Sequence, residues 1–419
     1  MKNNIYSIKG TKDILPIDSI KWKFIENKVH QTMENWGFGQ IRTPVFEKTQ
    51  LFKRSVGEES DIVSKQMYSF KDQSENDLTL RPELTAPVMR AYIQHNMERH
   101  YGSLNKLYYI DSLYRQERPQ AGRLREFSQF GAEAIGSKNP EQDIEIIFLV
   151  LNIFKDLGLD NINILINSVG SIESRENYKK DLINFFEPHK KKLSETSKKR
   201  LQTNPLRILD SKIPEEIEIL KNAPDIFDYL SKNDKEHFNF ILSTMKSCNI
   251  KFSRDPKLVR GLDYYSRTTF EIISSDVGSQ SAICGGGRYD SLVEKLGGKP
   301  TPAVGFAAGI DRILIALSKK EISQKTSSLA IQIICFEDIF NHKILSKILE
   351  LRKSGLIVYF DTLRRSIKAQ MREANKNKVS HVIIIGSHEM ENNKVQIKDL
   401  NSSKQVEIDF DEINNYFKK

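Results

Sequence analysis

Apolar and polar residues follow two different periods along the chain, and each period predicts regular secondary structure. Apolar residues recur at helical spacing from Ser19 to Trp36, which predicts an amphipathic helix. Short runs of the strand type follow at Thr79 to Arg81, Leu107 to Tyr114 and Ile162 to Asn167. We therefore expect residues 1–168 to form a mixed α and β unit.

The pattern changes after residue 168, where the chain becomes lysine-rich and helical. Basic runs at 190–192 and 198–200 lie in this part, which predicts a helical insertion over residues 169–250. Such runs could contact an RNA backbone, although charged helix faces are more often only solvated. Core-like sequence resumes over residues 251–318. The polar stretch 319–328 has no apolar periodicity, so we expect an interdomain linker there.

Strand and helix patterns alternate from residue 329 to 419. The expected elements are strands at Ile331 to Phe336, Leu356 to Phe360, Val382 to Ile385, around Val395 and Ile397, and around Val406, Ile408 and Phe410, with helices at His342 to Lys353 and from Arg365. This alternation predicts a compact α/β module.

Composition limits the classes of protein that the chain can represent. It has 419 residues, of which 39% are hydrophobic and 28% charged, enough for two or three domains. The net charge of +9 favours a polyanionic partner. The amino terminus lacks an apolar signal segment, and no run is long enough to cross a bilayer, so we expect a soluble cytoplasmic protein with no membrane and no DNA partner.

Three cysteines, Cys248, Cys284 and Cys335, lie far apart in the sequence. Their spacing indicates neither a disulfide framework nor a zinc cluster, so we expect buried thiols and no zinc.

The segment from Tyr114 to Phe127 carries four arginines between two strand-like runs, with Pro119 and Gly122 at the bend. Guanidinium groups match phosphate oxygens, so this hairpin could hold a triphosphate, an RNA end or both. Residues two apart on a strand share a face. We therefore expect Arg115 and Glu117 to point one way on the outgoing strand, and Gln129, Gly131 and Glu133 to line one face of the return strand. The alternative is a solvated basic edge.

The hairpin resembles motif 2 of the class II aminoacyl-tRNA synthetases, and it is most similar to their histidine-specific members. Five other segments match in the same order along the chain: motif 1 at Arg42 to Glu47, the amino-acid-binding turn at Thr79 to Ala86, two histidine-specific signatures at Leu258 to Tyr265 and Gly285 to Asp290, and motif 3 at Pro302 to Arg312. Six matches in order span nearly the whole chain.

This resemblance implies a fold and a set of partners. The expected fold is α/β (α+β), an antiparallel sheet flanked by helices, with residues 1–168 and 251–318 forming the two parts of the catalytic core. Residues 169–250 would be a helical insertion, and residues 329–419 would read the anticodon. The implied partners are L-histidine, ATP with Mg²⁺, the histidine tRNA and a second copy of the chain, paired through motif 1.

The resemblance also assigns candidate residues for adenylation. Arg115 and Arg260 would be catalytic, because positive charge is needed where the transition state gathers negative charge at the α-phosphate. Arg115 would also contact the substrate carboxylate. Glu117 would accept from the adenine amino group, Arg123 would contact the outer phosphates, and Arg312 would contact the γ-phosphate or stack on adenine.

A histidine pocket needs partners for an ammonium, a carboxylate and an imidazole. The implied set is Glu83, Thr85, Arg115, Gln129, Glu133, Arg260, Tyr264, Tyr265 and Tyr289. Glu83, Thr85 and Gln129 would receive the ammonium, with Glu83 and Thr85 on one side of an extended chain. Glu133 and the tyrosines would hold the imidazole, and one of Tyr264 and Tyr265 is expected to face away as ordinary strand packing.

The remaining implied contacts lie at the hairpin tip, where Gln120 and Arg125 would meet the acceptor end of the tRNA. The triple glycine at 285–287 is not followed by Lys-Ser/Thr, which excludes a Walker-type phosphate loop and favours close backbone approach to the amino acid. Two positions depart from the family pattern: Leu84 stands where glycine is common, and Asp311 where glutamate is common.

Two alternatives are open at this point. A noncatalytic regulator similar to the synthetase-like subunit of ATP phosphoribosyltransferase would share the core, but it typically lacks the carboxy-terminal module and the intact arginine signature. A plain RNA-binding protein would not need the acids and amide at 83, 129 and 133.

Overall fold

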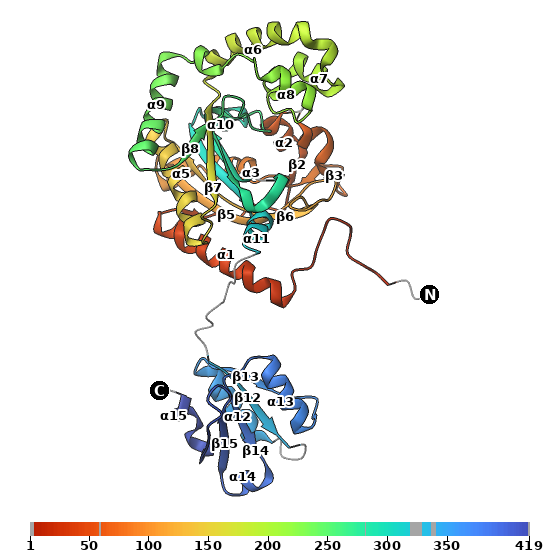
Figure 1. The fold of residues 1–419 in the computed structure, drawn as a ribbon, viewed down its shortest axis with the longest axis vertical. Helices are drawn as coiled ribbons and strands as arrows, with labels where there is room; N and C mark the ends of the chain where they lie inside the picture. The colour runs from red at the N-terminus through yellow and green to blue at the C-terminus, as the bar shows by residue number, and fades with distance from the viewer. Residues whose placement is uncertain (1–3, 58–59, 281, 319–328, 337–340, 418–419) are drawn as a thin grey trace. The chain divides into compact units, whose positions relative to one another are not determined.

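The computed structural model describes residues 4–57, 60–280, 282–318, 329–336 and 341–417 (Figure 1). The chain forms two compact units, Met1–Ile322 and Ser323–Lys419. The linker that we expected at 319–328 lies outside the described residues. Among the described residues no helix is both long and apolar enough to span a bilayer.

An eight-stranded sheet forms the centre of the larger unit, in the order β1-β5-β6-β11-β10-β9-β7-β8. Its pairs are antiparallel from β5 to β7, and only the edge pairs β1/β5 and β7/β8 are parallel. The strands are β1 Gly39–Gln40, β5 Asn105–Tyr114, β6 Glu126–Ile135, β7 Ile162–Ser168, β8 Phe252–Arg254, β9 Ser266–Ser274, β10 Ala282–Arg288 and β11 Ala303–Gly309. The predicted antiparallel sheet is confirmed.

Helices cover one face of this sheet because alternate strand residues on that face are apolar. Phe130, Ala132 and Ala134 of β6 are fully buried there against α1 and α5. The covering helices are α1 Pro16–Asn35, α5 Pro140–Asp156, α9 Lys232–Ser247 and α11 Ile310–Ala316. Both α1 and α5 begin with proline, which fits the first turn of a helix because no hydrogen bond is lost there. The predicted helix at 19–36 is confirmed as α1.

The opposite face carries a second apolar cluster and smaller elements. These are the three-stranded sheet of β2 Phe46–Lys48, β4 Asp77–Leu80 and β3 Tyr68–Lys71, with the helices α2 Thr49–Val56, η1 Ile62–Gln66, α3 Thr85–Gln94, α4 Met97–Tyr101 and α10 Leu292–Lys295. Leu84 is buried in this cluster, next to Val88 and Tyr92. The candidate site residues of the hairpin lie on this face.

Residues between β7 and β8 are helical, in accordance with the lysine-rich pattern. They form α6 Ile172–Phe186, η2 Glu187–Lys192, α7 Glu195–Thr203, η3 Pro205–Ile208, α8 Pro214–Leu220, η4 Ile226–Tyr229 and α9 (Figure 1, green). Serines at 171, 194 and 231 cap α6, α7 and α9 through their side-chain oxygens. The module has its own core around Tyr178, and its boundaries at 169 and 250 remain a prediction.

The smaller unit contains a five-stranded sheet in the order β13-β12-β14-β15-β16. Its elements are β12 Ala330–Cys335, α12 His342–Lys353, β13 Ile357–Phe360, α13 Ile367–Lys376, β14 His381–Ile385, α14 Ser387–Glu391, β15 Lys394–Asp399, β16 Gln405–Asp409, η6 Phe410–Glu412 and α15 Ile413–Phe417. Here the predicted alternation is confirmed, with two corrections. Phe410 belongs to η6, and α13 begins after Arg365, because the Asp361 carboxylate holds the Arg365 backbone N–H in a turn.

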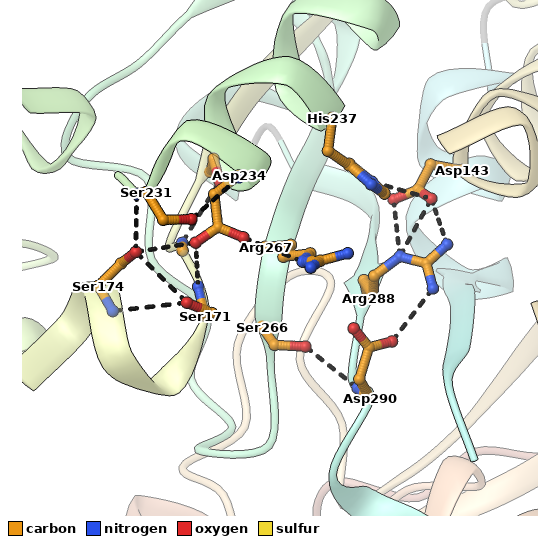
Figure 2. Close-up of polar contacts among 12 residues, drawn as sticks. Asp143, Ser171, Ser174, Ser231, Asp234, His237, Ser266, Arg267, Arg288 and Asp290 are labelled. Atoms are coloured by element: carbon orange, nitrogen blue, oxygen red, sulfur yellow. Dashed lines mark hydrogen bonds and ion pairs between the residues drawn. The ribbon is translucent and has the colours of Figure 1, made fainter. Parts of the chain in front are cut away.

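A buried ion pair joins the sheet to the covering helices (Figure 2). Arg288 of β10 donates to the Asp143 carboxylate of α5 and to the backbone carbonyls of Ser137 and Asn139, and both charged side chains are fully buried. Burial alone would raise the pKa of Asp143, but Arg288 and His237 together outweigh burial and lower this pKa to about 2. His237 of α9 also lies 3.4 Å from Asp143.

Asp143→Ala should destabilise the larger unit by up to about 3–5 kcal/mol, because Arg288 would lose its fully buried counter-charge and keep only Asp290, which is 29% exposed. The urea midpoint followed by tryptophan fluorescence reports on this unit, since Trp22 and Trp36 both lie in it. Lys198→Ala, which breaks an exposed pair with Glu195, is the control and should leave the midpoint unchanged. Equal effects of the two substitutions would contradict the prediction.

Candidate active site

A cavity of about 330 Å³ opens on the face of the large sheet opposite α1 and α5, between the β5–β6 hairpin and the signature at 258–265. Arg115, Arg260 and Arg312 all line it, although they come from three distant parts of the sequence. Glu117, Arg123 and Gln129 line it too. A second cavity of about 310 Å³ shares the arginines and extends to the insertion, at Arg200, Arg207 and Asp210.

Arg115 lies just beyond the strand rather than on it. Strand β5 ends at Tyr114, and Glu117 turns back so that its backbone N–H donates to the Arg115 carbonyl. Arg115 and Glu117 therefore lie beyond the strand that we expected to carry them, although both side chains line the same cavity. The Arg115 Nε donates to the Pro82 carbonyl at 2.9 Å, and its guanidinium lies over the Phe127 ring. Burial lowers the pKa of Arg115.

Glu117 sits between two arginines. Its carboxylate oxygens lie 3.6 Å from Arg115 Nη1 and 3.8 Å from Arg123 Nε. The Arg123 side chain is 45% exposed at the cavity mouth, while Glu117 is only 13% exposed. The glutamate thus balances part of the positive charge in the cavity.

Arg260 lies flat against the sheet and pairs with Glu271 of β9. A side chain at Gly285 would collide with it, since a Cβ there would lie 2.0 Å from Arg260 Nη2. The first glycine of the triple glycine therefore makes room for an arginine, while the expected approach of this backbone to the amino acid stays a prediction. Burial opposes the charge of Arg260, but Glu271 together with Tyr265 and Cys284 outweighs burial and raises the pKa of the guanidinium.

Arg312 is in the first turn of α11, as predicted. Its guanidinium donates to the carbonyls of Gly122 and Ala282, so it joins the hairpin to β10. The neighbouring Asp311 accepts from the Ser128 backbone N–H at 3.2 Å and pairs with Lys12 at 2.6 Å. Asp311, which is shorter than the glutamate common in the family, therefore binds both the hairpin and the amino-terminal segment.

A row of small residues forms the floor between these groups. Pairing places Tyr109, Gly131, Ala307, Gly285 and Glu271 side by side across five strands. Residues directly opposite each other in antiparallel strands point to the same face. The three central residues are glycine or alanine, which makes room for the Tyr109 hydroxyl over Gly131 and for the Arg260 guanidinium over Gly285.

Glu133 lies deeper, beside this floor, and accepts three hydroxyl groups. The donors are Thr85 at 2.8 Å, Tyr109 at 3.0 Å and Tyr289. Gly305 opposite Glu133 leaves room for its carboxylate, because a Cβ there would lie 1.7 Å from Oε2. Burial raises the pKa of Glu133 to about 8 despite the three donors.

We expected Glu83 to lie in an extended chain, but it lies just before helix α3. Its carboxylate accepts from the backbone N–H groups of Thr85 at 2.7 Å and Ala86 at 3.0 Å, the ordinary role of an acid at a helix start. Burial raises the pKa of Glu83 to about 7, and the backbone N–H groups of Ala86 and Thr85, followed by nearby Arg115, limit the rise. Thr85 is directed to Glu133 instead of standing beside Glu83.

Tyr264 and Tyr265 correct another expectation, since both belong to one aromatic cluster. Their rings lie 4.8 Å apart and 5.5 and 6.4 Å from Tyr289. The alternation rule for strands does not apply, because the two residues lie in a turn before β9 begins at Ser266. Tyr264 is 2% exposed and Tyr265 9%.

Gln120 and Arg125 lie apart from the cavity lining. Gln120 is exposed at the hairpin tip, and its backbone pairs with Arg123. Arg125 is half-buried and packs its side chain against Gly10. Their assignment to the acceptor end stays a prediction.

Two residues of the site were not predicted from the sequence. Tyr109 could be found only from the hairpin register, which pairs it with Gly131. Glu271 had a local signal, since it is a charged residue between the buried Phe270 and Ile272, but its partner Arg260 is visible only in three dimensions.

Comparisons with known proteins identify the family. A family model described as histidyl-tRNA synthetase matches residues 10–313, and one described as anticodon binding domain matches residues 331–419. The histidine--tRNA ligase of Chloroherpeton thalassium is 47% identical over 96% of this chain and 95% of its own length, and that of Chlorobium limicola is 44% identical over 98% and 96%. The crystal structure of apo Staphylococcus aureus histidyl-tRNA synthetase superposes with a TM-score of 0.84 at 36% identity, covering 99% of this chain and 100% of that one.

By its fold and its relatives the chain is thus a class II aminoacyl-tRNA synthetase. Within that class the chain belongs to the histidyl-tRNA synthetase family.

The stability of the larger unit should fall as pH rises from about 5 to 8. Glu83 and Glu133 stay protonated in the folded protein up to about 7 and about 8, whereas their ordinary pKa is 4.5. Within that window the folded state binds more protons, so each group that ionises only on unfolding lowers the free energy of unfolding by up to about 1.4 kcal/mol per pH unit.

Urea midpoints measured across this range would check the sign, and Glu133→Gln should flatten the slope. Glu195→Gln, at an exposed position, serves as the control and should keep the wild-type slope. A midpoint that rises with pH, or the same slope in Glu133→Gln, would contradict the pKa assignment.

Proposed function

We propose that this chain attaches L-histidine to its tRNA in two steps at the cavity described above. Histidine and ATP form histidyl-adenylate and release diphosphate, and the acyl group then passes to the terminal ribose of the tRNA with release of AMP. One observation carries the proposal: Arg115, Arg260 and Arg312 meet at one cavity, beside the buried acids Glu83 and Glu133.

The first step brings two anions together, so its barrier depends on fixed positive charge. A carboxylate oxygen of histidine attacks the α-phosphorus, the bond to the leaving diphosphate breaks, and negative charge gathers on the phosphoryl oxygens. Arg115 and Arg260 are fixed by Pro82 and Glu271 before substrate enters, so they need little reorganisation. We assign them the catalytic roles.

ATP would lie along the hairpin side of the cavity. Glu117 would accept from the adenine amino group, Arg123 would contact the outer phosphates, and Arg312 would contact the γ-phosphate or the adenine face. ATP enters as its magnesium complex. Of the four acids that line the cavity, Glu117 and Glu271 pair with arginine and Asp210 and Asp311 with lysine, and the part of the chain that is described contains no group of three metal-ligating side chains. This suits a Mg²⁺ carried mainly by phosphate oxygens and water.

Histidine would lie over the small-residue floor, with its imidazole directed to Glu133 and the tyrosine cluster. Glu133 has three hydroxyl partners that can rearrange around an imidazole N–H, and a ligand without that N–H would leave a buried acid poorly satisfied. Glu83, Thr85 and Gln129 would receive the ammonium, while Tyr264, Tyr265 and Tyr289 enclose the ring. Arg115 and Arg260 would hold the carboxylate.

The tRNA would contact both units. The unit at 329–419 would read the anticodon, and Gln120 and Arg125 would meet the acceptor end. A net charge of +9 supports binding of a polyanion.

We further propose a cytoplasmic homodimer. Its support is the motif 1 resemblance and the exposed apolar residues around it, with Val45 41%, Phe46 53% and Phe70 45% exposed.

A noncatalytic histidine-sensing regulator is not favoured. The chain retains Arg260 in the cavity and a carboxy-terminal unit that matches the anticodon binding domain over residues 331–419. The relatives at 44–47% identity over nearly the whole chain are named as ligases.

The purified chain should exchange labelled diphosphate into ATP only when histidine is present. A regulator would bind histidine without catalysing exchange. A plain RNA-binding protein would neither bind histidine nor catalyse exchange. Exchange in the absence of added amino acid, or with phenylalanine as readily as with histidine, would contradict the proposal.

Arg260→Ala should lower the rate of adenylate formation by about 10²–10³-fold while weakening histidine binding far less, because its charge acts mainly in the transition state. Single-turnover kinetics would give the rate, and equilibrium titration with histidine the affinity. Arg99→Ala, which changes an arginine of α4 that lines neither cavity, is the control. Comparable losses in rate and affinity would make Arg260 a binding residue only.

A further inference from the structure

The loop at 258–265 carries Arg260 and the two tyrosines, yet it has little structure of its own. It contains neither helix nor strand. Its own backbone hydrogen bonds are one at Leu258 and a long one of 3.4 Å from Asp263 N–H to the Val56 carbonyl. Something other than local backbone pairing must therefore fix the direction of Arg260.

Side chains of the helical insertion contact this loop at three places. Arg207 Nη2 donates to the Gly261 carbonyl at 3.1 Å, directly after Arg260. Both Arg207 Nε and Nη2 also lie within 3.0 Å of Asp263 Oδ1, and Asn204 donates to the same oxygen at 2.8 Å. Arg175 of α6 donates to the Tyr265 carbonyl at 2.8 Å. The insertion thus holds the loop from Gly261 to its last residue.

These contacts hold a fixed geometry because the insertion is itself tied to the sheet (Figure 2). Asp234 of α9 accepts from Ser171 N–H and the Ser174 hydroxyl at the start of α6, and its other oxygen accepts from Arg267 of β9 at 3.0 Å. Arg267 follows the loop by two residues. The start of α6, the start of α9 and the first residues of β9 therefore meet at one buried carboxylate, with Asp234 2% exposed.

Arg207 is well suited to this role. It is 7% exposed although it belongs to a largely basic, solvated module, and its planar guanidinium binds a carboxylate and a carbonyl together. Asp263 is shared by two donors from the insertion. It lines neither of the cavities around Arg260, whereas Arg207 lines the second one.

We propose that Asp263 is a positioning residue for adenylation: it anchors the loop to Arg207 and Asn204 of the insertion, and so directs Arg260 toward Glu271 and the α-phosphate. This proposal rests on the proposed function. It makes the helical insertion a structural part of the adenylation site, in addition to any contact that it makes with RNA.

The test uses the full-length protein with histidine-dependent diphosphate exchange, and rates are normalised to the histidine-binding sites found by titration. Asp263→Ala should lower kcat by about 10–100-fold, since a shift of about 1 Å in a charged group has effects of that size, with a much smaller change in the KM for histidine. Asp263→Asn keeps an acceptor oxygen and should retain clearly more activity than Asp263→Ala. Equal losses in these two variants would overturn the proposal.

Arg207→Met separates positioning from direct contact with substrate. If both residues act through the same anchor, the double variant should be no slower than the slower single variant. A slow Arg207→Met beside a fully active Asp263→Ala would overturn the proposal and assign Arg207 to the substrate. Additive losses would overturn it as well.

Arg254→Met is the matched control. It removes an arginine of β8 that pairs with Asp225 of the insertion and not with the loop, the two side chains being 30% and 31% exposed. Its kcat should equal that of the wild type, and a fall as large as that of Arg207→Met would overturn the proposal. If the wild type itself showed no histidine-dependent exchange, the proposed function would fail rather than the role of Asp263.

Discussion

The register of the antiparallel sheet is the constraint on which the site depends. Because opposite residues share a face, the pairing of β5, β6, β11, β10 and β9 places Tyr109, Gly131, Ala307, Gly285 and Glu271 in one row. A shift of one residue in any of these pairs would turn a polar side chain into the apolar core on the other face. The core therefore fixes the site, since burial of Phe130, Ala132 and Phe306 allows only one register.

Charge at the cavity is balanced before any substrate binds. Arg115 and Arg123 flank Glu117, and Arg260 pairs with Glu271. These ion pairs offset the repulsion between the guanidinium groups and restrict their motion. The guanidinium groups are therefore already oriented toward an incoming phosphate. The deeper acids follow a different rule. Glu83 and Glu133 lie where burial raises the pKa, and a cationic ligand bound beside them would favour their ionised forms.

The helical insertion contributes to this arrangement through side chains rather than through the sheet. Arg175, Asn204 and Arg207 contact the loop that carries Arg260, and Asp234 ties α6 and α9 to β9. A catalytic arginine on an irregular loop needs such external support, because the loop has few backbone hydrogen bonds of its own. The buried pair of Arg288 and Asp143 gives comparable support at the end of β10.

The sequence by itself predicted the elements with a strong period, namely α1, the long hairpin strands and the alternating strands and helices of the carboxy-terminal unit. It also indicated which arginines and acids belong to one chemistry, because short motifs keep their spacing in the chain. What failed were inferences that extended strand geometry past the true ends of strands. Arg115 lies in a turn, Glu83 precedes a helix, and Tyr264 and Tyr265 share a cluster.

Only the tertiary structure decided which distant groups meet. Three contacts join residues that share no sequence period. They are the ion pair of Arg260 with Glu271, the hydrogen bond from the Tyr109 hydroxyl to Glu133, and the hydrogen bond from Arg207 to Asp263. Local patterns report whether a residue is buried or exposed, because that depends on its own element. Partners across strands and modules depend on register and packing, which are set by the whole core at once.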